Sequence, residues 1–74
     1  MITQKYDLHI YPLEVIEQAK QDFSQIAKIF VAQKKHIAKC YFLFCVADEQ
    51  QTVNEFSNYL IDLIGSKGYI HENY

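Results

Sequence analysis

The side chains that could do chemistry in this 74-residue chain are three histidines, two cysteines and nine acidic residues. His9, His36 and His71 fall in a predicted strand, a hairpin and the tail, and none has a partner ligand at the helical spacing of zinc motifs. Most of the acidic residues lie on the polar faces of predicted helices, where a carboxylate is normally solvated. We therefore expect no metal site and no cofactor.

The two cysteines do not form a familiar reactive arrangement. Cys40 and Cys45 are an odd number of positions apart within one apolar stretch, so a strand would place them on opposite faces and keep them from pairing. A Cys–His pair would combine Cys40 with His36, but along a strand they would be roughly 13 Å apart at about 3.3 Å per residue. The only two glycines follow the second predicted helix, so the sequence has no phosphate-binding glycine loop. These patterns predict buried free thiols and no enzyme.

The element that must organise the fold is residues 38–47, which carry a single charge, several aromatic residues and neither Gly nor Pro. This composition predicts a central strand that is apolar on both faces. Alternation assigns its side chains to two sets. One face would carry Ala38, Cys40, Phe42, Phe44 and Val46, and the other Lys39, Tyr41, Leu43 and Cys45.

Four further segments have recognisable patterns. Residues 5–11 alternate as a half-buried strand, and Pro12 opens an amphipathic helix from Leu13 to about Ser24. Residues 26–32 are β-branched and aromatic enough for a strand, joined to the central strand by a hairpin over residues 33–36. A second helix begins after the N-cap Asp48 and ends near Gly65. Tyr69 and Ile70 either add a short fourth strand or belong to a loose tail.

This order predicts an α+β, ferredoxin-like fold of the split β-α-β-β-α type. A right-handed crossover leaves a gap beside the first strand, and the central strand fills it, giving an antiparallel sheet of order 1-3-2 with two helices on one face. A chain this short leaves the other sheet face uncovered, and an uncovered apolar face normally marks an interaction surface. The sequence leaves open which set of side chains faces the helices. As candidate binding residues on the open face or edge we name Ile29, Val31, Tyr41 and Leu43.

Composition narrows the class of protein. The chain fits one small domain, residues 1–74, and half of it is apolar, which is typical of a packed core. The net charge of −2 gives no field that would attract nucleic acid or an anionic membrane. No apolar run is long enough to span a bilayer, and no secretory signal pattern is present. We expect a cytoplasmic protein that binds neither nucleic acid nor membrane.

Two segments resemble a known family. Residues 10–16, followed by Ala19 and Phe23, and residues 54–62 in the second helix are similar to the HxsD-like proteins, small accessory proteins of His-Xaa-Ser peptide systems that are encoded with radical SAM maturases. The resemblance spans about residues 7–64. The matches that packing alone does not demand are Glu14, Glu55 and Asn58. The resemblance implies an accessory or peptide-handling role and no catalytic residues.

Two functions from different classes follow. The first is a non-catalytic accessory module that holds a peptide or partner enzyme, such as a radical SAM maturase or its substrate peptide, on an open sheet face or edge. The second is a self-assembling ferredoxin-like homodimer with a structural or small-ligand-sensing role. The mass of the protein in solution discriminates between them, because only the second requires a dimer that persists on dilution.

Overall fold

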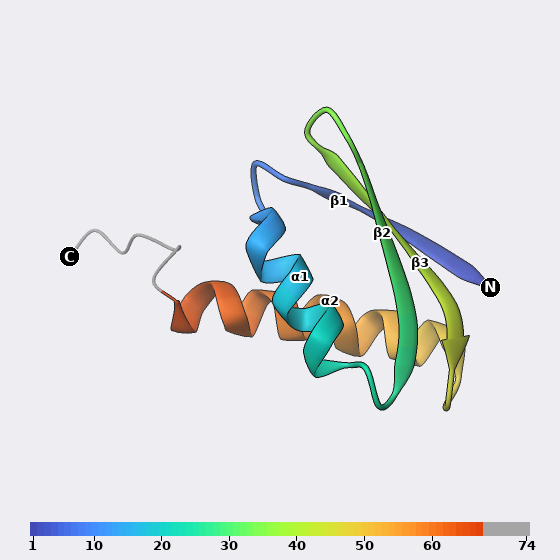
Figure 1. Ribbon diagram of the computed structural model, residues 1–74. Coiled ribbons are helices and arrows are strands. Elements are labelled where there is room, and N and C mark those ends of the chain that lie inside the picture. The colour runs from blue at the N-terminus through green and yellow to red at the C-terminus, as the bar shows by residue number, and fades with distance from the viewer. Residues whose placement is uncertain (68–74) are drawn as a thin grey trace.

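The computed structural model describes residues 1–67, which form two helices against one sheet (Figure 1). The elements follow in the predicted order: strand β1 (Ile2–Asp7), helix α1 (Leu13–Asp22), strand β2 (Ala27–Lys34), strand β3 (Ile37–Cys45) and helix α2 (Glu49–Ser66). The β-α-β-β-α order of an α+β, ferredoxin-like fold is confirmed. Tyr69 and Ile70, the expected fourth strand, lie outside the described residues.

The sheet has the strand order β1-β3-β2, as predicted. β3 is antiparallel to both neighbours, pairing Ala38 with Tyr6 of β1 and Phe42 with Ile29 of β2. Because β3 is paired on both sides, β1 and β2 are the edge strands. Each of them therefore has one side with backbone groups that no strand within residues 1–67 pairs.

The core lies between one face of the sheet and both helices (Figure 1). Phe56 of α2 is at its centre, with its ring edge-on to Phe42 of β3 at 5.3 Å and to Phe23 after α1 at 5.2 Å between centroids. Tyr6 of β1 joins this group and its hydroxyl is 2.7 Å from Ser57 Oγ, which satisfies its polar end. The apolar side chains with no exposed surface come from α1, β3 and α2, namely Val15, Ile16, Ala19, Ala38, Cys40, Phe42, Phe56 and Leu60. Burying these apolar surfaces together is the main favourable term in the folding of the domain.

A β-bulge in β3 changes the alternation that the sequence predicts. Ile29 pairs with Phe42 but Lys28 pairs with Phe44, so Leu43 is an extra residue without a partner. The prediction that Phe42 and Phe44 share a face is therefore wrong, since Phe42 is buried and Phe44 is 62% exposed. Val46, expected on the same face, lies beyond the strand and is exposed. The bulge also makes the predicted opposition of the two cysteines wrong, because Cys45 returns to the core side with Cys40.

β1 begins and ends earlier than predicted. The predicted strand covered residues 5–11, but the backbone turns after Asp7, whose carbonyl oxygen accepts hydrogen bonds from the N–H groups of Ile10 and Tyr11 at 2.9 and 2.8 Å. The Asp7 carboxylate also accepts the N–H of His9 at 2.9 Å. An aspartate that bonds its own backbone two residues on favours a turn over a strand, and here this local chemistry outweighs the alternating pattern. Ile10, which the alternating pattern places on the same face as the buried Tyr6, is exposed.

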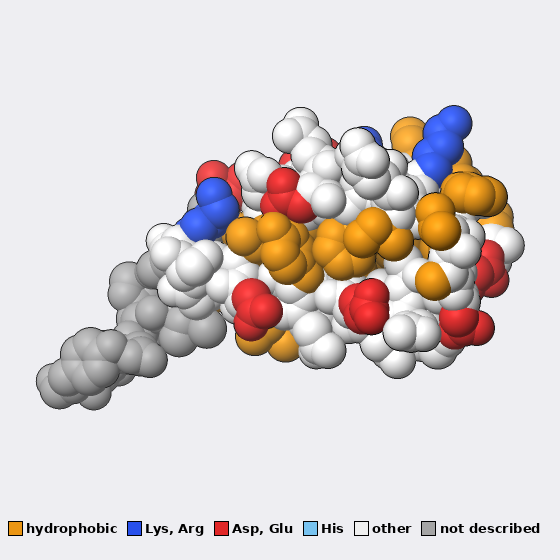
Figure 2. All heavy atoms as spheres, turned by 90° about the horizontal axis from the view of Figure 1, so that it is seen from below, with side chains coloured by type: hydrophobic (Ala, Val, Ile, Leu, Met, Phe, Trp, Pro, Cys, Tyr) orange, Lys and Arg blue, Asp and Glu red, His pale blue; other side chains and the backbone are white. Residues whose placement is uncertain are grey.

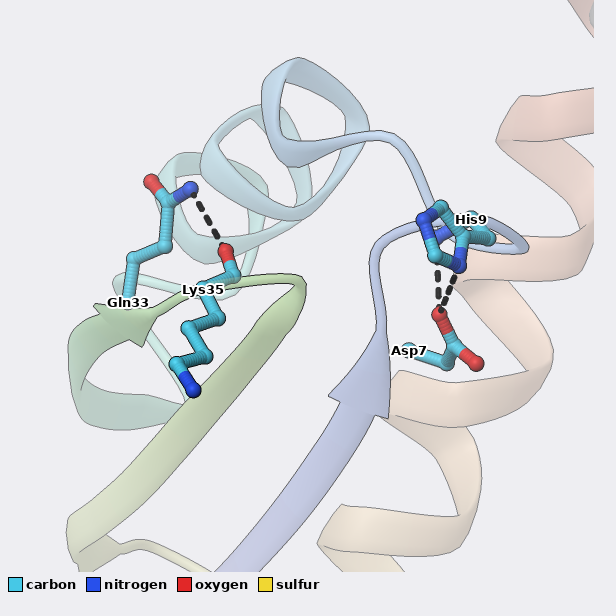
Figure 3. Close-up of polar contacts among 4 residues, drawn as sticks. All are labelled: Asp7, His9, Gln33 and Lys35. Carbon is cyan, nitrogen blue, oxygen red and sulfur yellow. Dashed lines mark hydrogen bonds and ion pairs between the residues drawn. The ribbon is translucent and has the colours of Figure 1, made fainter.

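The β2–β3 hairpin is tighter than the predicted four-residue connection. Gln33 and Lys34 belong to β2 and pair with Ala38 and Ile37, so the turn consists of two residues, Lys35 and His36. Lys35 has a φ of 55°, a left-handed conformation that is costly for a residue with a Cβ. The Gln33 side chain supports the turn by donating to the carbonyl oxygen of Lys35 at 3.3 Å (Figure 3).

The observed start of α2 agrees with the sequence prediction, and the observed ends of both helices differ from it slightly. Asp48 is the predicted N-cap, and its carboxylate accepts the N–H of Gln51 at 2.9 Å. Gly65, which the sequence indicates as the C-cap, lies inside α2, which ends one residue later at Ser66 and is capped by Lys67. Nothing approaches within 4 Å of the place where a Cβ on Gly65 would lie, so the helix continues through it without steric need for glycine. α1 ends two residues before the predicted Ser24, with Phe23 as its cap.

Candidate functional site

The face of the sheet that the helices leave uncovered has an apolar half near the bulge. Phe30 of β2 is 55% exposed, and Leu43 and Phe44 of β3 are 46% and 62% exposed. The Phe30 ring lies 6.0 Å from the ring of Tyr41, its partner across the strands. We call Phe30, Tyr41, Leu43 and Phe44 the apolar patch. Exposed aromatic side chains grouped in this way are typical of a surface that binds another molecule.

The other half of the same face, toward the hairpin, is basic. A shallow cavity of about 520 Å³ lies there, floored by Ala32 and Ile37. Its remaining walls are Lys5, Lys34, Lys35, His36 and Lys39. We call it the lysine cavity. Lys39 connects the two halves, because its Nζ lies 5.1 Å above the ring centre of Tyr41 in a cation–π contact.

The acidic residues are on the opposite side of the molecule. Seven of the nine belong to the two helices or to the cap of α2: Glu14, Glu17, Asp22, Asp48, Glu49, Glu55 and Asp62. In the view from below, acidic side chains border a band of apolar ones, and basic side chains are few (Figure 2). The net charge of −2 is therefore unevenly distributed, with positive side chains on the uncovered sheet face and negative side chains on the helices. A negatively charged partner would be attracted to the sheet and repelled by the helices.

A groove follows the free edge of the sheet beside β2. Its volume is about 500 Å³, and it is lined by Lys20 and Ser24 at the end of α1 and by strand residues that include Lys28, Phe30 and Leu43. The groove meets the apolar patch at Phe30 and Leu43. An extended segment in this groove would lie next to the unpaired backbone groups of β2, which is the geometry needed to add a strand.

The four binding residues named from the sequence separate into two pairs. Tyr41 and Leu43 are on the uncovered face, whereas Ile29 is buried and Val31 packs against the core. Ile29 and Val31 belong to the edge strand β2 but face the core and not the open side, because the register pairs Phe30, and not Ile29, with Tyr41. Sequence reasoning therefore missed Phe30 and Phe44. Knowing which parity of β3 faces the helices would have recovered Phe30, but Phe44 depends on the bulge.

The Cys40 thiol is poorly suited to nucleophilic chemistry. Cys40 and Cys45 are both free. Burial, and secondarily the nearby Glu17 carboxylate, raises the pKa of the Cys40 thiol to about 12. A thiol must ionise to act as a nucleophile or metal ligand, so Cys40 stays protonated at neutral pH and packs as a small apolar residue.

The structure does bring together a group of metal-ligating residues that the sequence pattern does not indicate. Asp7 at the end of β1, His9 in the following turn and His36 in the hairpin turn each offer one ligand atom, and these atoms all lie within 4.8 Å of one another. The two imidazole rings are stacked, with centroids 4.8 Å apart and planes 11° from parallel. His9 and His36 are exposed, while Asp7 is half-buried. These residues meet because the turn after β1 lies beside the β2–β3 hairpin turn in the fold. Their spacing along the sequence does not predict this contact.

Comparison with known proteins gives no further guide to the function. No family model, no curated protein and no solved structure matches this chain. Within residues 1–67, neither helix is both long and apolar enough to cross a membrane.

Proposed function

We propose that this protein is a non-catalytic binding module that holds a peptide, or an exposed segment of a partner protein, on the uncovered face of its sheet. The observation that carries the proposal is the division of that face into the apolar patch and the lysine cavity. An apolar anchor would pack on Phe30 and Phe44, and acidic groups of the same partner would lie among Lys5, Lys34 and Lys39. The partner is thus a segment that carries both apolar and acidic side chains.

The free edge of β2 supplies a way to hold such a segment. A peptide that pairs with β2 would form main-chain hydrogen bonds and place alternate side chains over the apolar patch. Phe30 and Leu43 line both the groove beside β2 and the apolar patch, so a segment in the groove contacts the patch directly. Main-chain pairing gives affinity with little sequence preference, and the patch and the lysine cavity supply the selectivity.

Self-association is the weaker alternative. In a dimer that packs two uncovered faces with their hairpin ends together, the lysines of both copies would come together in a region removed from water, and with the ends reversed they would be buried on the apolar patch. Like charges placed opposite each other oppose association, and burying unpaired lysines adds a desolvation cost. A partner of opposite charge meets neither penalty.

An accessory role in peptide maturation is consistent with this binding surface. The resemblance of residues 7–64 to HxsD-like proteins implies a partner among the peptides or enzymes of a radical SAM system. The two free cysteines favour a reducing compartment, which supports our proposal of a cytoplasmic location. We propose no catalytic residue for the module itself.

The test is a selection of binding peptides from a random library displayed on phage. The selection uses the wild-type protein, and the enriched peptides are then measured against a Phe30→Ser/Phe44→Ser variant. We expect the enriched peptides to combine acidic and apolar residues. We also expect the variant to bind them at least tenfold more weakly, because removing a central aromatic anchor usually costs about 2 kcal/mol of binding free energy. A matched control is Ile61→Ser, which changes an apolar side chain on α2 that is 50% exposed.

Charge is tested in the same assay. The substitutions Lys5→Glu and Lys39→Glu should weaken binding further and reduce its dependence on salt, whereas Lys67→Glu at the end of α2 should not. The proposal is overturned if the peptides bind the Phe30→Ser/Phe44→Ser variant as well as wild type. It is also overturned if the face binds single-stranded RNA or DNA homopolymers more tightly than any selected peptide.

A further inference from the structure

The geometry points to a divalent transition-metal site formed by Asp7, His9 and His36, and we propose that the protein binds one such ion there. The His9 Nδ1 and the Asp7 Oδ1 are 3.4 Å apart (Figure 3). Two ligand atoms that share a tetrahedral ion at about 2.0–2.2 Å are themselves roughly 3.3–3.5 Å apart, so this pair is already close to the distance that an ion requires. The ligand atom of His36 lies within 4.8 Å of both.

The backbone holds the three residues in place from both sides of the site. The Leu8 N–H donates to the carbonyl oxygen of His36 at 2.7 Å, which ties the turn after β1 to the hairpin turn. Asp7 pairs with Ile37, the residue after His36, as the last pair of the β1–β3 ladder. The rings of His9 and His36 are stacked with their planes 11° from parallel, so at least one ring must rotate before both lone pairs point at the same ion. Both imidazole side chains are exposed, so they have room to rotate toward a shared ion.

The ligand set selects the class of ion. Two imidazoles and one carboxylate suit borderline ions such as Zn²⁺, Co²⁺ and Ni²⁺, and they suit Ca²⁺ or Mg²⁺ poorly because those ions prefer oxygen ligands. Lys34 and Lys35 border the lysine cavity beside His36 and oppose the binding of a cation. Imidazole ligands bind transition ions by donating lone pairs, and the Asp7 carboxylate offsets part of the repulsion. We therefore expect moderate affinity, in the micromolar range.

Three protein ligands leave at least one position of the ion open. Water fills this position in the free protein, and an anionic group of a bound partner could replace it. Because His36 also lines the lysine cavity, the open position would be next to the basic half of the uncovered face. The site stands on its own geometry and does not depend on the proposed peptide binding.

The experiment is a calorimetric titration of the full chain with Zn²⁺ alone, followed by the variants His9→Gln, His36→Gln and Asp7→Asn. We expect one ion per chain, and a loss of at least about tenfold in affinity for each variant, because changing even an outer partner of a metal ligand commonly costs about 10–100-fold. The melting temperature should rise with Zn²⁺ in wild type and not in the variants, since the ion joins two turns of the folded state. Circular dichroism of each variant without metal verifies that it is folded.

Two controls separate this site from other places where Zn²⁺ could bind. His71→Gln removes the third histidine, and Cys45→Ser removes the less buried thiol; both should leave the affinity unchanged. The proposal is overturned if the wild-type protein binds no Zn²⁺ at concentrations up to about 100 µM. It is also overturned if substitution of His71 or Cys45, and not of the three proposed ligands, lowers the affinity.

Discussion

The two faces of the sheet have different roles, although the same three strands form both of them. On the helix side, Tyr6, Phe42 and Ile29 are buried against the two helices, and the Tyr6 hydroxyl is hydrogen-bonded to Ser57. On the other side, Phe30 and Phe44 extend into solvent beside a group of lysines. The covered face contains what stability requires. The open face contains apolar side chains that folding does not need, and this is the reason to assign it to binding.

The largest difference between the faces should appear when one aromatic ring is removed from each. Phe56→Ala on the covered side should lower the free energy of unfolding by about 3–5 kcal/mol, because Phe56 is fully buried among three other aromatic rings. That loss is comparable to the whole stability of a domain this small. Urea unfolding followed by circular dichroism measures it. A loss below 1 kcal/mol or so would contradict the assignment of the core to this face.

Alkaline pH should also act on the covered face. Burial raises the pKa of Tyr6 from 10.0 to about 12 and that of Cys40 from 9.0 to about 12. Both groups stay protonated in the folded protein at pH values where the unfolded chain ionises, so stability should be lost between about pH 9 and 12 and not below. Tyr6 alone should account for about 2 kcal/mol of this loss by about pH 12.

Unfolding by urea at several pH values from 8 to 11.5 tests this prediction. Tyr6→Phe removes one ionising group and should make the stability less sensitive to pH above 10. An equal pH dependence in wild type and Tyr6→Phe would show that Tyr6 is not the group responsible.

A smaller effect is expected at the hairpin turn, where the open face ends. Lys35 has a positive φ, and glycine adopts that conformation without a steric penalty. Lys35→Gly should therefore stabilise the protein by up to about 1 kcal/mol. Thermal unfolding measures the gain, and Lys34→Gly, a change within the paired strand β2, is the matched control that should destabilise. Stabilisation by the control and not by Lys35→Gly would contradict the account of this turn.

The smallest effect on stability is expected on the apolar patch. Phe44→Ser and Phe30→Ser should each change the free energy of unfolding by no more than about 0.5–1 kcal/mol, since both rings are more than half exposed. The same substitutions should remove most of the peptide binding. A large loss of stability would mean that these rings serve the fold, and the contrast between the two faces would then disappear.

The sequence was sufficient for the architecture because the architecture rests on composition. Residues 38–47 are too apolar for an edge strand, and the helices have clear apolar stripes, so the order 1-3-2 follows from packing. The details of the site were not predictable, because they depend on single local choices. The bulge at Leu43 moves Phe44 to the open face, and the turn after Asp7 brings His9 beside His36. Neither the bulge nor the turn produces a periodic pattern of apolar and polar residues that could be recognised in the sequence.

The measurement that tests the central claim most directly is the mass of the protein in solution, determined by sedimentation equilibrium from about 200 µM down to about 1 µM, a range that spans weak and tight association. The wild-type protein and the Phe30→Ser/Phe44→Ser variant are compared. Our account predicts that both are monomers at the low end of the range, with the uncovered face free for a partner of another kind. A wild-type dimer that persists on dilution, together with a monomeric variant, would show that the face serves self-association and would contradict the proposed function.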